Sequence, residues 1–143
     1  MISSLSEDIS FGALKVLVVD DLPTNCKVLS HLLTKLGSQV ETCNSGEAAL
    51  QLCSEKKYHL VLLDLHMPSM SGFETGEKLI ESREGSTPLI VAQTADETPK
   101  ACERTTKIGF DGHLTKPIRP GHVSKFLNQA LSLSEPRQSS PRA

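Results

Sequence analysis

Short aliphatic runs alternate with stretches of helical periodicity along most of this 143-residue chain. Three of the runs, at 15–20, 60–64 and 89–93, are almost continuously aliphatic, which is typical of parallel strands covered by helices on both faces. Two more polar runs, at 40–43 and 112–114, suit the edges of a sheet. Strands that alternate with helices in this way predict βαβ units on a parallel sheet.

Five helical segments follow the five predicted strands, and several carry start or stop signals. Ser71 and Glu74 form a capping box at the start of the third helix. Thr98 is the expected N-cap of the fourth, with Pro99 in its first position. The apolar faces of the first and fifth helices are predicted to be Val28, Leu29, Leu32, Leu33 and Leu36, and Val123, Phe126, Leu127, Ala130 and Leu131. We therefore predict a doubly wound α/β fold of the flavodoxin-like kind, with five helices and strand order 2-1-3-4-5.

Three acidic residues come directly after two of the central strands. The first strand leads into Asp20 and Asp21, and the third ends in Asp64. In the predicted order these strands are neighbours, so their carboxyl ends share one crevice. Two like charges about 5 Å apart repel by roughly 3 kcal/mol at an effective dielectric of 20. A hard cation relieves this repulsion, and an all-oxygen site with few protein ligands suits Mg²⁺.

The next two strands add a hydroxyl and a cation to the same edge. The fourth strand ends in Thr94, and the fifth leads into Lys116 and Pro117. Carboxylates, a metal ion, a hydroxyl and an ammonium are the groups that phosphoryl transfer onto a carboxylate needs, because neutralisation of the phosphoryl oxygens does most of the catalytic work. Asp64, at the centre of the sheet, is the predicted nucleophile.

Residues 14–131 resemble a response-regulator receiver domain of the CheY-like kind. The segment 21–25 and the closing Lys116-Pro117-Ile118 resemble most closely the receivers of hybrid sensor histidine kinases and phosphorelays. The resemblance rests on Val18-Val19-Asp20-Asp21, on Leu62-Leu63-Asp64-Leu65-His66-Met67-Pro68, on Met70-Ser71-Gly72, on Ala92-Gln93-Thr94-Ala95, and on the segment 109–118.

The resemblance implies that Asp64 is phosphorylated by a histidine kinase or a histidine phosphotransfer protein. It implies that Asp21, Asp64 and the backbone carbonyl of His66 hold Mg²⁺, with Asp20 assisting through water. Thr94 and Lys116 would act on the phosphoryl group, and the Lys116–Pro117 bond would be cis. Such a domain is not an independent enzyme, although its parent chain can be a histidine kinase.

Some positions depart from the family pattern, namely Leu22 for the usual Asn, Cys26 for Arg and Gln93 for an aliphatic residue. The largest departure is His113, which stands where many receivers have a switch Tyr or Phe. It places in doubt the aromatic rotation that signals phosphorylation to the far face, and leaves Thr94 and His113 as the predicted switch residues.

Three other functions fit these residues less well. A Mg²⁺-dependent phosphatase that forms an aspartyl phosphate would need an acid where the chain has His66. An FMN-binding protein would need a Ser, Thr or Gly-rich phosphate loop instead of residues 20–23. A receiver-like scaffold that has lost phosphorylation is disfavoured because no acceptor-site residue is missing. A stand-alone single-domain response regulator remains the alternative to a piece of a hybrid kinase.

Composition and charge limit the partners and the compartment. With 17 acidic residues, 15 basic residues and no Trp, the chain offers no footprint for nucleic acid or an anionic membrane. The four cysteines have no metal or redox spacing, so we expect free thiols and a cytoplasmic domain, even if the parent protein is membrane-anchored. Residues 1–13 are predicted to be an N-terminal extension, and the Ser- and Pro-rich residues 132–143 a disordered tail or linker.

Overall fold

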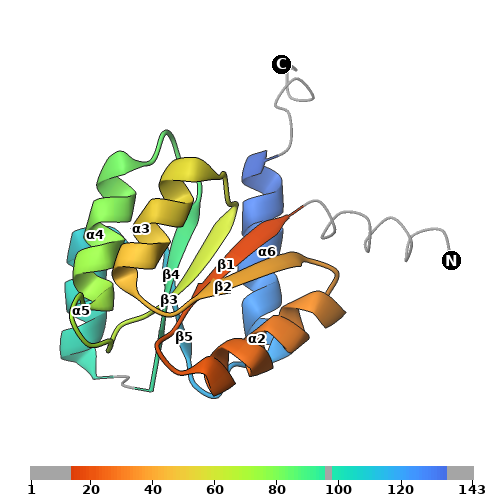
Figure 1. Ribbon diagram of the computed structural model, residues 1–143, viewed down its shortest axis with the longest axis horizontal. Helices are drawn as coiled ribbons and strands as arrows, with labels where there is room; N and C mark the ends of the chain where they lie inside the picture. Colours follow the sequence, from red (N-terminus) through yellow and green to blue (C-terminus); the bar gives the residue numbers. More distant parts are fainter. Residues whose placement is uncertain (1–13, 96–97, 135–143) are drawn as a thin grey trace, which may run out of the picture.

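Five parallel strands form the centre of the protein in the computed structural model, which describes residues 14–95 and 98–134 (Figure 1). The strands are β1 (Lys15–Val19), β2 (Gln39–Cys43), β3 (Leu60–Asp64), β4 (Leu89–Thr94) and β5 (Gly112–Thr115). Their order is β2-β1-β3-β4-β5. The predicted flavodoxin-like order is therefore confirmed, with the two polar strands at the edges.

Five helices within the described residues alternate with the strands. They are α2 (Pro23–Lys35), α3 (Gly46–Glu55), α4 (Gly72–Ser82), α5 (Pro99–Ile108) and α6 (Pro120–Ser134). Three of them begin at side-chain caps, in which the hydroxyls of Ser45, Ser71 and Thr98 accept backbone N–H groups. Figure 1 shows α2 and α6 on one face of the sheet and α3, α4 and α5 on the other.

The core consists of two apolar layers on the two faces of the sheet. Every residue of β3 and β4 is buried, because helices cover both faces of these central strands. The layer beneath α2 and α6 includes Val18, Leu62 and Val91, and the layer beneath α3 and α4 includes Val19, Leu63 and Ile90. This alternation fixes which face each strand residue points to, and so it positions the side chains at the strand ends.

Two details of the predicted elements are wrong. Val28 is 65% exposed rather than part of the core face of α2. The buried positions of that helix are Cys26, Leu29 and Leu33, and Val28 lies about 160° around the helix from Cys26 and about 140° from Leu33. Helix α6 continues to Ser134, three residues into the predicted tail, because Leu131 still packs on the core and extends the last turn.

The predicted extension at 1–13 and the rest of the predicted tail, 135–143, lie outside the described residues. Among the helices of residues 14–95 and 98–134, none combines the length and the apolar character that a membrane crossing needs.

Candidate functional site

Three carboxylates meet where β1 and β3 end. Val19 pairs with Leu63 across these strands, so Asp20 and Asp64 follow at matching positions. One carboxylate oxygen from each of Asp20, Asp21 and Asp64 lies within 4.8 Å of the others. Asp20 and Asp64 are buried and Asp21 is half-buried. The structure thus brings together the three acids that the sequence placed at one edge of the sheet.

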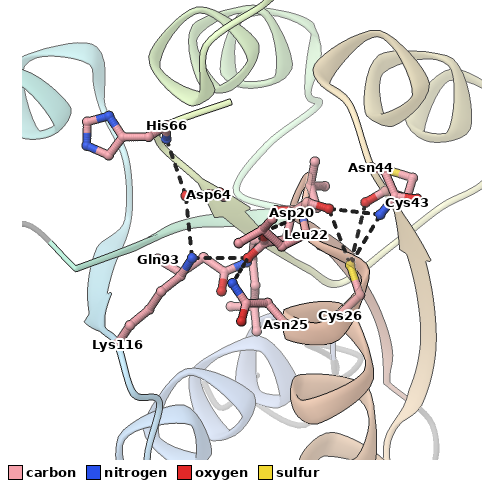
Figure 2. A network of polar contacts seen from close by, with 12 residues as sticks. Asp20, Leu22, Asn25, Cys26, Cys43, Asn44, Asp64, His66, Gln93 and Lys116 are labelled. Atoms are coloured by element: carbon pink, nitrogen blue, oxygen red, sulfur yellow. Dashed lines mark hydrogen bonds and ion pairs between the residues drawn. The ribbon is translucent and has the colours of Figure 1, made fainter. Parts of the chain in front are cut away.

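Lys116 reaches this cluster from the loop after β5 (Figure 2). Its Nζ lies 3.1 Å from Asp20 Oδ2 and 3.6 Å from Asp64 Oδ1. The peptide bond between Lys116 and Pro117 is cis. Because one ammonium group faces three carboxylates, the cluster keeps an excess of negative charge when all three acids are ionised.

Asp20 is held in place by main-chain and side-chain donors. Its Oδ1 accepts the backbone N–H of Leu22 at 3.0 Å, and its Oδ2 accepts the amide of Asn25 at 3.3 Å. Its carbonyl oxygen accepts the amide of Asn44 at 2.9 Å. The thiol of Cys26 donates to the same carbonyl oxygen at 3.4 Å. These bonds compensate the burial of a charged group and leave it little freedom to move.

The environment of Asp64 changes the pKa of its carboxyl group. Burial raises its pKa, and the negative charges of Asp20 and Asp21 act in the same direction. The ammonium of Lys116 and the backbone N–H of His66, which donates to Oδ1 at 3.3 Å, oppose this rise. The resulting pKa is about 6, so the carboxylate is mostly ionised at neutral pH.

Helix α4 begins directly against the phosphoacceptor candidate, at Gly72. A Cβ at this position would lie 2.1 Å from the carbonyl oxygen of Asp64 and 2.6 Å from the Cα of Leu65. The N–H of Gly72 donates to the carbonyl of Leu65 at 3.0 Å. Glycine is therefore required sterically where the chain turns from β3 into α4.

The remaining predicted residues lie at different distances from the cluster. Thr94 is the buried last residue of β4, the strand beside β3. The His66 ring is exposed, and Figure 2 shows it turned away from the carboxylates. His113 lies in β5 and contacts the Thr105 hydroxyl of α5 through Nε2, so its ring belongs to the packing between strand and helix rather than to the acidic cluster. Burial lowers the pKa of His113.

The donor set fits a small hard cation. Each of the three acids offers a carboxylate oxygen, and oxygen ligands that carry negative charge are those Mg²⁺ prefers. One divalent ion would balance the charge that Lys116 leaves uncompensated. The residues present are therefore suited to hold Mg²⁺.

Sequence reasoning missed two residues that organise the site. Asn44 follows β2 and supports the main chain of Asp20 from the edge of the sheet. Its position just after a strand that neighbours β1 was the available signal. The sequence identifies Gln93 only as a departure from an aliphatic pattern, and the structure places this buried residue in register with Asp64 on the neighbouring strand.

Comparisons with known proteins agree on one family. Residues 16–128 match the family model of the response regulator receiver domain. The two-component response regulator ORR3 of Oryza sativa subsp. indica is 32% identical over 117 residues, 81% of this chain and 89% of that protein. The sensor histidine kinase GacS of Pseudomonas protegens is 33% identical over 144 residues, 99% of this chain but 16% of the kinase. The chemotaxis protein CheY4 of Vibrio cholerae has a TM-score of 0.75 at 29% identity, covering 82% of this chain and 98% of that one.

Proposed function

Because the chain belongs to the response regulator receiver domain family of two-component signalling, we propose that Asp64 accepts a phosphoryl group from a phosphohistidine in a Mg²⁺-dependent reaction. The observation that carries the proposal is the convergence of Asp64 with two further carboxylates and with the ammonium of Lys116. Family membership alone leaves open whether a given chain keeps a working acceptor. The complete set of charged groups at the strand ends supports one here.

The reaction is a displacement at phosphorus. A carboxylate oxygen of Asp64 forms the new P–O bond while the P–N bond to the donor imidazole breaks and its electron pair returns to the ring nitrogen. Lys116, 3.6 Å from Asp64 Oδ1, is placed to neutralise a phosphoryl oxygen. Thr94, at the end of the adjacent strand, is our candidate for a hydroxyl donor to another oxygen. A pKa of about 6 keeps Asp64 mostly ionised, and hence nucleophilic, at pH 7.

Asp21, Asp64 and the backbone carbonyl of His66 are the proposed metal ligands, with Asp20 acting through water. Bound Mg²⁺ would supply positive charge to the transferring phosphoryl group and to the carboxylates. The contacts of Asp20 support a water-mediated rather than a direct role, because its carboxylate already has Lys116, Asn25 and the Leu22 N–H as partners.

The proposed phosphodonor is a histidine kinase or a histidine phosphotransfer protein. The chain spans 89% of ORR3 but 16% of GacS, so it corresponds to a nearly complete small regulator and to one domain of a large kinase. We propose that this domain belongs to a hybrid kinase, and a stand-alone regulator is the alternative. We assign it no role in binding nucleic acid or a membrane. The four free cysteines support a cytoplasmic location.

Thr94 and His113 are the proposed switch residues. The His113 ring is half-buried and bonded to Thr105 of α5, so it links β5 to that helix by a hydrogen bond. We expect phosphorylation to shift a two-state equilibrium of this face by about 1 to 3 kcal/mol, the usual scale of such coupling. In His113→Phe, which loses the bond, NMR shifts of α5 on phosphorylation should differ from wild type. Identical shifts in the two proteins would exclude a role for His113.

Incubation with a small acyl phosphate and Mg²⁺ tests the proposal. Intact-protein mass spectrometry should show the gain of one phosphoryl group, which is lost in Asp64→Asn and absent when the metal is chelated. Asp111→Asn is a matched control, since Asp111 is also partly buried and paired with a cation, Arg83, but lies outside the cluster. Uptake of phosphate by Asp64→Asn would refute the assignment of the acceptor.

A further inference from the structure

Gln93 is a buried polar side chain in the same row of the sheet as two of the acids. It pairs with Asp64 between β4 and β3, and Asp64 lies opposite Asp20 at the end of β1. Residues in register on parallel strands point to one face, so the three side chains share the face that α2 and α6 cover. Gln93 is 1% exposed. An amide therefore lies beside the proposed phosphoacceptor, where the family pattern has an aliphatic side chain.

The amide of Gln93 links three strands. Its Nε2 donates to the carbonyl oxygen of Val19 in β1 at 3.3 Å and to that of Leu62 in β3 at 3.4 Å. The side chain thus starts on β4, crosses β3 and reaches β1. Figure 2 draws Gln93 in the polar network that also contains Asp20 and Lys116. A bond of this kind joins strands that the backbone ladder of the sheet does not join directly.

The peptide unit that Gln93 contacts is the one that leads into Asp20. The carbonyl of Val19 accepts from Gln93, and the N–H of Asp20 in the same peptide unit donates to the carbonyl of Cys43 in β2 at 3.2 Å. The peptide is therefore held from both sides, by β2 and by β4. Its orientation sets where the Asp20 carboxylate lies relative to Asp64.

A purely structural role is a poor explanation of this residue. A buried amide costs free energy unless its hydrogen bonds are made, whereas an apolar side chain of similar volume would pack at this position without that cost. What the amide adds is a fixed relation between the ends of β1, β3 and β4. Carboxylates that are held at a constant spacing bind a metal ion without reorganising first.

We propose that Gln93 is a positioning residue for the metal site, which ties β4 to β1 and thereby sets the spacing of Asp20 and Asp64 for a divalent cation. The inference rests on the proposed function, because it concerns the Mg²⁺ on which phosphorylation of Asp64 depends. Gln93 itself is not a ligand in this account. It acts through the main chain of β1 and β3.

Gln93→Met tests the proposal, with Val91→Ala as the control. Methionine keeps the length of the side chain but cannot donate, while Val91 is a buried neighbour on the same strand and face. In calorimetric titration of the metal-free proteins, Mg²⁺ should bind Gln93→Met about tenfold more weakly than wild type. The phosphorylation rate should fall at low Mg²⁺ and recover at saturating Mg²⁺. Val91→Ala should lower the stability in urea without changing the Mg²⁺ affinity.

Each other outcome overturns the inference. If Gln93→Met binds Mg²⁺ with an affinity within twofold of wild type, a positioning role is excluded. If the wild-type protein does not bind Mg²⁺, the proposed function is overturned as well. If Gln93→Met does not fold, hydrogen exchange measured by NMR on the wild-type protein still tests the inference. The side-chain amide protons of Gln93 should exchange with solvent far more slowly than those of the exposed Gln51. Equal exchange rates would show that the bridge to β1 does not exist.

Discussion

Asp64→Asn should stabilise the metal-free protein at neutral pH. The carboxylate of Asp64 is buried among two other acids, and its pKa rises from 3.8 to about 6 in the folded state. A folded state with the higher pKa holds the proton more tightly, so ionisation of Asp64 begins to cost folding free energy above pH 3.8 and reaches its full cost above about pH 6. Asparagine is nearly isosteric, carries no charge, and keeps an oxygen that can accept the His66 N–H.

The size of the effect follows from the shift in pKa. At about 1.4 kcal/mol per pKa unit, the ionised group costs about 3 kcal/mol at pH 7. The cost falls to about half of this at pH 5 and to a small fraction of it at pH 4, because the folded state takes up the proton first. Below the pKa of the unfolded chain, both states are protonated and the cost vanishes. We therefore expect the free energy of unfolding of Asp64→Asn to be about 1 to 3 kcal/mol higher than that of wild type at pH 7. At pH 4 the two proteins should have almost the same stability.

Urea unfolding of both proteins in chelator, followed by circular dichroism from pH 4 to pH 7, measures this difference. Asp111→Asn is the control of opposite sign. Its carboxylate accepts Arg83 Nη1 and the Ile90 N–H, each at 2.8 Å, and its loss should destabilise the protein by about 1 to 3 kcal/mol. The argument about burial is wrong if Asp64→Asn is less stable than wild type at pH 7, or if the difference does not shrink toward pH 4.

Three further predictions concern other parts of the protein. Gly72→Ala, whose Cβ would meet the Asp64 carbonyl at 2.1 Å, should lose about 1 to 3 kcal/mol of stability and phosphorylate more slowly, whereas Gly121→Ala meets nothing within 4 Å and should leave both unchanged or slightly improved. Lys116→Met should lower the stability in chelator, and Mg²⁺ should then raise its melting temperature more than that of wild type; an equal rise would contradict the charge balance proposed for the cluster. Burial raises the pKa of Cys43 to about 11, so iodoacetamide at pH 8 should alkylate it on the order of a hundredfold more slowly than a free thiol, and peptide mapping that shows comparable rates would refute its burial.

The chain order of the elements and the location of the site could be predicted from local sequence patterns. Aliphatic runs such as 60–64 identify buried parallel strands, and residues such as Ser71 and Thr98 mark the starts of helices. The more polar runs at 39–43 and 112–115 are edge strands in the structure. Since the carboxyl ends of parallel strands meet at one edge, the positions of Asp20 and Asp64 followed from the strands themselves.

Side-chain contacts between distant elements could not be predicted in this way. Helical periodicity alone put Val28 on the core face, while the packing of α2 against the sheet left it exposed. The position of Asn44 after the strand beside β1 placed it near Asp20, but did not indicate that its amide would donate to the carbonyl oxygen of Asp20. These contacts depend on how far one element is shifted or rotated relative to another. The periodicity within a single element does not specify that placement.

The sequence by itself determined the doubly wound sheet, its edge strands and the meeting of three carboxylates at the ends of β1 and β3. Only the tertiary structure decided that Lys116 bridges Asp20 and Asp64, and that Gln93 crosses β3 to reach the carbonyl of Val19. The physical reason is the separation in sequence of the residues that interact. Strand and helix patterns arise from residues a few positions apart, whereas these contacts join residues 96, 52 and 74 positions apart and depend on the register of strands that are not neighbours in the chain.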